Sequence, residues 1–165
     1  MKKVLVDTTY FLPLAGIALE GIDSSSILKI LLGNNFQIQL SEVSLFELAA
    51  KGAKLATETT LTYQEVLRGI DTLRYDAKVT IQTWTNNPTI LELAFALRLF
   101  HADFIYCLIL ATAVSSAEIF ATYDDELYKK LLEQKKILNT ITTMNPLFSF
   151  WFGDLTKESV PLKKL

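Results

Sequence analysis

The sequence is short of the residues that build small cross-linked or zinc-bound folds. It has one cysteine, Cys107, and one histidine, His101, among 165 residues, which excludes a disulfide framework and a zinc knuckle. Near the N-terminus a charged residue, Asp7, follows only a few apolar ones, far fewer than a signal-peptide core or a membrane span needs. We therefore expect a cytoplasmic protein that does not contact a membrane.

An excess of basic charge is also missing. The 16 lysines and arginines are outnumbered by 18 aspartates and glutamates, for a net charge of −2 and a pI near 5.4. Proteins that bind nucleic acid mainly by electrostatic attraction carry a basic excess. Any contact with nucleic acid must therefore be local or mediated by a metal ion.

Apolar residues make up 50% of the chain, enough for one domain with a substantial core. Short β-branched or alternating runs predict strands at 3–7, 36–40, 78–82, 118–122 and 137–142. Helical spacing predicts helices at 24–32, 41–51 with a stop at Gly52, 55–75, 88–100, 103–115 and 124–135. This alternation is typical of an α/β fold, and we expect a three-layer α/β/α sandwich with a mainly parallel central sheet.

The last part of the chain differs in composition from the rest. We expect the domain to cover residues 1–144 and a tail to cover 145–165, first aromatic and then charged. The tail contains Phe148, Phe150, Trp151 and Phe152, a cluster too apolar to be left in water. It either packs on the domain or forms an interface with another chain, and we favour the interface.

Acidic side chains stand where strands end or helices begin. Asp7 closes the first strand, Asp124 follows the strand at 118–122, Asp103 opens a very apolar helix, and Glu47 lies early in the helix after the second strand. The crevice of an open parallel sheet forms outside the carboxyl ends of its strands. These four side chains, called the four site carboxylates below, are therefore expected to converge.

Four converging carboxylates would repel one another and raise their pKa values unless a cation joined them. An all-oxygen ligand set suits Mg²⁺ or Mn²⁺, and such a site supports hydrolysis of a phosphodiester bond. His101 stands beside Asp103, but a metal site makes a histidine base unnecessary. We interpret it as a residue at a helix boundary.

Three of the four site carboxylates have a simpler interpretation as well. Ser44 and Glu47 have the spacing of a helix capping box, and Asp103 is a suitable helix N-cap. Asp124 begins a helix, where acidic residues are favoured on electrostatic grounds. Asp7 is the strongest candidate, because aspartate is poorly suited to a strand and its neighbours suggest no capping role.

Four segments together resemble the motifs of the PIN-domain family, in the family's order. They are VLVDTTYFL at 4–12, SEVSLFEL at 41–48, ADFIYCLILATA at 102–113 and ATYDDEL at 121–127. The resemblance spans most of the chain from Val4 to Leu127. It implies the PIN sandwich fold and cleavage of RNA by an endonuclease that depends on Mg²⁺ or Mn²⁺.

The resemblance also assigns roles to residues. The metal ligands would be the four site carboxylates, and the small hydroxyl residues that support them would be Thr8, Thr9, Ser44 and Thr122. Asp125 is an alternative ligand to Asp124, because the choice of Asp124 over Asp125 rests only on the match to the family motif. Many small prokaryotic PIN proteins are VapC-type toxins, commonly dimeric and inhibited by a co-expressed antitoxin, so an antitoxin partner and a homodimer are expected.

Four basic residues follow Glu47 along the chain: Lys51, Lys54, Arg68 and Arg74. They form either a local rim for RNA phosphates or a solvated helix surface.

Two functions other than that of an active nuclease have to be weighed. A PIN-like scaffold that binds RNA or a protein with little catalysis is the main alternative. Hydrolysis of a small phosphorylated substrate is disfavoured, because Thr9 stands where that class has a second aspartate.

Overall fold

The computed structural model describes residues 1–18, 33, 36–153 and 160–161. The helix expected at 24–32 lies outside these residues. None of the described helices is long and apolar enough to cross a membrane.

A six-stranded sheet forms the centre of the molecule, with strand order β3-β2-β1-β4-β5-β6. The first five strands in this order are parallel: β3 (Val79–Gln82), β2 (Phe36–Ser41), β1 (Lys2–Val6), β4 (Ile119–Thr122) and β5 (Ser149–Phe152). The edge strand β6 (Val160–Pro161) is antiparallel to β5. The predicted α/β class with a mainly parallel sheet is confirmed.

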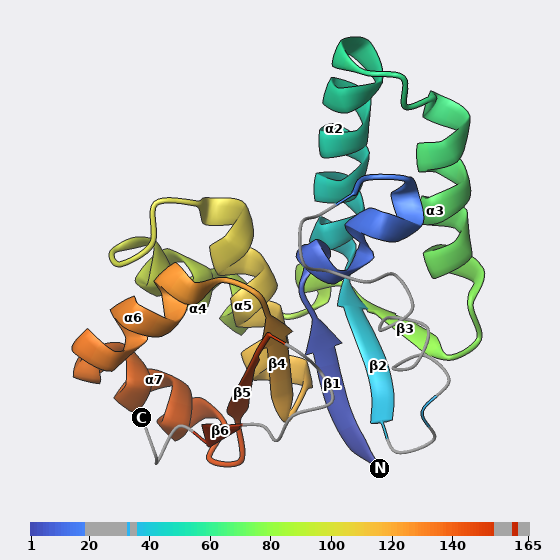
Figure 1. Ribbon diagram of the computed structural model, residues 1–165. Helices are drawn as coiled ribbons and strands as arrows, with labels where there is room; N and C mark the ends of the chain where they lie inside the picture. The colour runs from blue at the N-terminus through green and yellow to red at the C-terminus, as the bar shows by residue number, and fades with distance from the viewer. Residues whose placement is uncertain (19–32, 34–35, 154–159, 162–165) are drawn as a thin grey trace.

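Helices cover both faces of this sheet (Figure 1). One face packs against η1 (Thr8–Ala15), α2 (Glu42–Glu58) and α3 (Tyr63–Tyr75). The other packs against α4 (Pro88–Arg98), α5 (Phe104–Ser116), α6 (Asp125–Glu133) and α7 (Lys135–Met144), and the short helix η2 (Trp84–Asn86) precedes α4.

The two faces have separate apolar cores because successive side chains of a strand point to opposite sides. In β1, Val4 and Val6 enter one core and Leu5 enters the other. All three are at most 1% exposed, as expected for a strand covered on both faces. The end of β1, where Asp7 stands, is therefore held firmly from both sides.

The strand predicted at 137–142 is wrong, because this segment forms helix α7. Its β-branched residues suggested a strand, but Ile137 and Ile141 are four residues apart and lie on one face of a helix. Both are buried in the core beneath α5. Tertiary packing of that face decided the local structure.

The helix boundaries on the other side of the sheet also differ from the prediction. Helix α2 continues past Gly52 to Glu58, and a capping box of Thr62 and Glu65 starts α3. A Cβ atom at Gly52 would lie 2.4 Å from Cγ1 of Val66. Gly52 therefore serves the close approach of α2 and α3 rather than ending a helix.

Three of the aromatic residues near the C-terminus belong to strand β5, and Phe148 lies just before it. Phe148, Phe150 and Trp151 are buried in this chain's own cores, and Phe152 stacks on Phe150 with ring centroids 5.4 Å apart. The preference for an interface is therefore wrong for the three buried rings, and packing on the domain is what the structure has. Ser149–Phe152 extends the parallel sheet beyond β4.

The contact between α3 and η1 depends on a small residue. A Cβ atom at Gly69 would lie 2.5 Å from the backbone oxygen of Leu14 and 2.7 Å from Cα of Ala15. Gly69→Ala should lower the free energy of unfolding by about 1–2 kcal/mol, because overpacking outweighs the better helix propensity of alanine. Urea unfolding beside the exposed α3 control Thr72→Ala measures this, and a stabilised Gly69→Ala protein would contradict the packing described.

Candidate functional site

A cavity of about 250 Å³ opens where β1 and β4 end. Side chains from four segments of the chain line it: Asp7, Thr9, Glu47, Lys51, His101, Asp103, Tyr106, Tyr123 and Asp124. The structure thus brings all four site carboxylates to one place. Their convergence follows from parallel strands that end at the same edge of the sheet.

Asp7 is the most buried of the four and is 4% exposed. Its Oδ1 accepts a hydrogen bond from the amide of Thr8 at 2.8 Å and caps η1. The expectation that Asp7 has no capping role is wrong, because a 3-10 helix starts immediately after it. Its Oδ2 accepts from the hydroxyls of Thr9 at 2.9 Å and Thr122 at 3.1 Å.

The environment of Asp7 disfavours its charged form. The pKa of this carboxyl is raised from 3.8 to about 6, chiefly by burial and also by the nearby charge of Glu47, while the hydrogen bonds from Thr9 and Thr122 oppose the shift. The partners that bond to Asp7 are neutral donors. A cation beside Asp7 would therefore stabilise the folded protein at neutral pH.

Glu47 projects into the cavity from the second turn of α2. The N-cap of α2 is Ser41, whose Oγ accepts from the amide of Val43 at 3.3 Å. The capping-box interpretation of Ser44 and Glu47 is therefore wrong, since both lie inside the helix. Within the described residues the buried Oγ of Ser44 has no hydrogen-bond partner, so the structure gives Ser44 no bond to Glu47.

Two contacts hold the Glu47 carboxylate in place. The hydroxyl of Thr8 donates to its Oε2 at 2.5 Å, and Nζ of Lys51 lies 2.6 Å from its Oε1. Thr8, the residue that follows Asp7, thus bonds to both carboxylates, through its amide to Asp7 and through its hydroxyl to Glu47. Lys51, one turn further along α2, supplies the local positive charge in the cavity.

Asp103 and Asp124 are helix N-caps and also line the cavity. Oδ1 of Asp103 accepts from the amides of Ile105 and Tyr106 at the start of α5. Oδ1 of Asp124 accepts from the amide of Leu127 in α6 at 2.9 Å. The N-cap interpretation of Asp103 is thus correct, and Asp124, expected in the first turn of a helix on electrostatic grounds, is instead the N-cap of α6. Both caps leave the site assignment open because each uses Oδ1.

Thr122 joins the two strand-end aspartates. Its Oγ1 donates to Asp7 and accepts from the amide of Asp124 at 3.1 Å. The hydroxyl of Tyr106 donates to the same oxygen at 3.4 Å. Thr122 is fully buried, so it fixes the separation between the ends of β1 and β4.

Several predicted residues do not reach the cavity. Lys54, Arg68 and Arg74 are exposed on α2 and α3 and do not line it, and the guanidinium of Arg74 instead lies over the ring of Tyr75. The backbone of Asp125 begins α6, and its side chain lies outside the described part of the chain.

Three residues that line the cavity were not assigned to the site from the sequence. His101, interpreted as a boundary residue, does end the α4 region and also faces Asp124, with 3.8 Å between Nε2 and Oδ2. Tyr106 and Tyr123 lie within the motifs that contain Asp103 and Asp124. Their place in those motifs was the available signal.

The chemistry of the cavity fits a hydrated hard cation. No three of the described histidine, cysteine, aspartate and glutamate side chains are close enough to hold an ion as they stand. The arrangement does not suit a metal ion whose ligands all come from protein side chains. It suits Mg²⁺ or Mn²⁺, because Mg²⁺ keeps several water ligands and is commonly bound by only one or two carboxylates.

Comparison with known proteins supports the fold. No family model and no curated protein sequence matches this chain. A chain in the crystal structure of VapBC2 from Rickettsia felis, bound to a DNA fragment from their promoter, is similar with a TM-score of 0.56. It is 16% identical, and the alignment covers 90% of this chain and 96% of that one. This likeness shows the fold.

The raised pKa of Asp7 makes the stability depend on pH. Because its folded pKa, about 6, exceeds the unfolded value of 3.8, ionisation of Asp7 destabilises the protein increasingly from pH 4 to 6. Asp7→Asn removes this cost, about 3 kcal/mol at most. With EDTA present, the free energy of unfolding of Asp7→Asn, relative to that of wild type, should be higher at pH 7.5 than at pH 4.

Urea unfolding at both pH values measures this difference. Asp71→Asn, which removes an exposed carboxylate from α3, is the matched control for the loss of one charge. If Asp7→Asn differs from wild type by the same amount at both pH values, burial does not raise the pKa of Asp7.

Proposed function

We propose that this protein is a metal-dependent endoribonuclease of the PIN type that uses Mg²⁺ or Mn²⁺. The observation that carries the proposal is the meeting of four carboxylates from separate elements in one cavity, at the end of a parallel sheet. The order of the four sequence motifs and the similarity in fold to a VapBC2 chain support it.

The chain's own residues would divide the work. Asp7, with Asp103, Asp124 and Glu47 around it, would hold the ion. When bound, the ion would polarise the scissile phosphate and lower the pKa of an attacking water. Thr8, Thr9 and Thr122 orient the carboxylates through the hydrogen bonds described above.

Lys51 would contact the substrate. In the structure its ammonium group pairs with Glu47. A divalent ion that draws on the charge of Glu47 would weaken this pair and leave Lys51 available to a phosphate oxygen. Lys51 thus places one positive charge at the cavity, where the phosphate would bind, in a protein whose overall charge is −2.

The proposal extends to the partners of the protein. We propose RNA as the substrate, a protein antitoxin as the inhibitor and a homodimer as the assembly, as in VapC-type toxins. The motif resemblance and the fold of the VapBC2 chain support this extension. An RNA-processing enzyme without an antitoxin would use the same site.

Cleavage of a mixed, structured RNA by the purified protein tests the enzyme. Cleavage should require Mn²⁺ or Mg²⁺ and stop with EDTA. Asp7→Asn and Asp124→Asn should each lower the rate at least about a hundredfold, because each loses a charged ligand in a metal site. Asp71→Asn, far from the cavity lining, should cleave like wild type.

Circular dichroism should show that the inactive variants remain folded. If wild type cleaves no RNA with either ion, yet binds RNA or a protein partner, the scaffold function replaces the enzyme. If Asp7→Asn cleaves as fast as wild type, the cleavage does not come from this cavity.

A further inference from the structure

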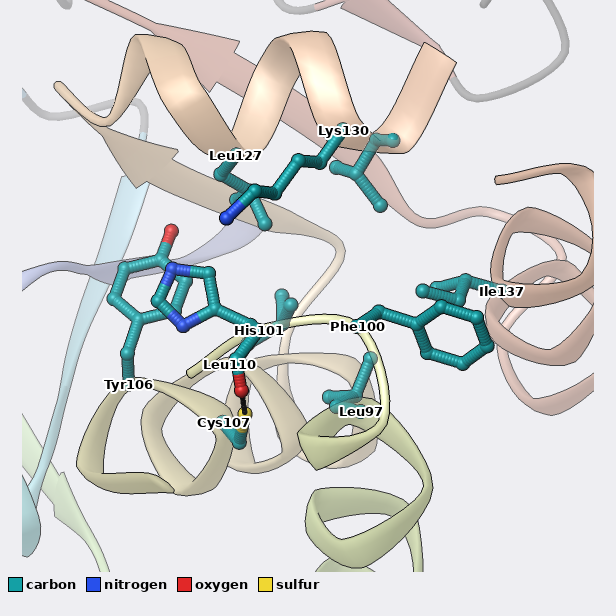
Figure 2. Close-up of a pocket in the computed structure, with 10 residues that line it drawn as sticks. Leu97, Phe100, His101, Tyr106, Cys107, Leu110, Leu127, Lys130 and Ile137 are labelled. Atoms are coloured by element: carbon teal, nitrogen blue, oxygen red, sulfur yellow. Dashed lines mark hydrogen bonds between the residues drawn. The ribbon is translucent and has the colours of Figure 1, made fainter. Parts of the chain in front are cut away.

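His101 occupies a fixed place at the edge of the cavity. Its backbone amide donates to the oxygen of Leu97 at the end of α4, and its own carbonyl oxygen accepts from Nη1 of Arg98. The thiol of Cys107 approaches the same carbonyl oxygen, as the dashed line in Figure 2 shows. The backbone that carries the imidazole is therefore anchored from both α4 and α5.

The orientation of the imidazole ring is also fixed. It packs against the ring of Tyr106 in a tilted arrangement, with centroids 4.8 Å apart and an interplanar angle of 31° (Figure 2). Its Nδ1 lies 3.2 Å from the amide nitrogen of Asp103 and 3.4 Å from the carbonyl oxygen of the same residue. The shorter contact comes from an amide, which can only donate, so Nδ1 accepts there and the proton of the neutral ring is assigned to Nε2.

That protonated nitrogen points at a site carboxylate. Nε2 of His101 lies 3.8 Å from Oδ2 of Asp124, whose other oxygen is engaged by the amide of Leu127. The separation exceeds a hydrogen bond, and both side chains are only partly exposed, at 16% and 26%. A small shift of the carboxylate would allow Oδ2 to bond His101 and a cation together.

We propose that His101 is a positioning residue that orients the Asp124 carboxylate for the metal ion, while its Nδ1 aligns the N-terminus of α5 beside Asp103. The inference rests on the proposed function. Carboxylates that ligate metals are typically held by a second hydrogen bond, and loss of such a partner commonly weakens metal binding by 10–100-fold.

A purely structural role would look different. His101 and Tyr106 line both the carboxylate cavity and an apolar pocket, and so form a wall between the two. Figure 2 shows the apolar pocket, which is also lined by Leu97, Phe100 and residues of α5, α6 and α7. If His101 served only as this wall, any flat ring of similar size would replace it. His101→Phe keeps a stacking ring and removes both nitrogens, so it separates the two roles.

Binding of Mn²⁺ to the full chain, followed by isothermal titration calorimetry, tests the proposal without relying on activity. His101→Phe and His101→Asn should each bind Mn²⁺ about tenfold more weakly than wild type. His101→Gln places an amide N–H near the position of Nε2 and should restore the affinity to within about threefold of wild type. Lys130→Ala is the control. The ammonium group of Lys130 pairs with Glu126 beside the apolar pocket, so its removal should leave Mn²⁺ binding at the wild-type level.

The proposal is overturned if folded His101→Phe binds Mn²⁺ as tightly as wild type, or if His101→Gln binds no better than His101→Asn. Should His101→Phe fail to fold in thermal melts, the comparison of Gln with Asn decides alone. If Asp7→Asn loses Mn²⁺ binding and cleavage while the His101 variants keep both, only the role of His101 is lost. If wild type neither binds Mn²⁺ nor cleaves RNA, the proposed function and this inference fall together.

Discussion

One buried negative charge sets the requirements for the rest of the site. Asp7 stands at the end of a strand covered on both faces, and it is bonded by an amide and two hydroxyls. Neutral donors reduce the cost of burying a carboxylate but do not remove it, and the pKa of about 6 reflects what remains. The two apolar cores offset that cost and keep Asp7 where a cation can reach it.

The topology explains how distant residues meet. Strands β1 and β4 are adjacent and parallel, so Asp7 and Asp124 emerge at the same edge although 117 positions separate them. Asp103 and Asp124 each cap a helix whose N-terminus faces the cavity. The partial positive charge of these helix ends reduces the repulsion among the carboxylates and favours phosphate nearby. Helix capping and the proposed metal binding therefore use the same residues.

The sequence predicts features that depend on local pattern. The buried run before Asp7 and the apolar α5 were predictable because both show continuous hydrophobic segments, and the convergence of carboxylates then follows from parallel strand ends. Long-range packing was not predictable. Helix α7 has a strand-like composition, and it forms a helix because Ile137 and Ile141 pack against α5.

The contact of His101 with Asp124 was likewise beyond the sequence. It comes from the end of α4 approaching the start of α6, a tertiary contact that no local pattern encodes. The role of Gly52 depends in the same way on α3 approaching α2. The role of a residue that lies between two elements is therefore hard to predict from the sequence, because the residues it contacts lie far away in the chain.

The central claim is that the four site carboxylates form the binding place of a hard divalent cation. A crystal structure of wild-type protein soaked in Mn²⁺, with anomalous diffraction to locate the ion, tests it most directly. The account predicts an anomalous peak in the cavity, within ligand distance of Asp7 and at least one other site carboxylate or its bound water. A cavity without such a peak at millimolar Mn²⁺, while the carboxylates keep the positions described, would contradict it.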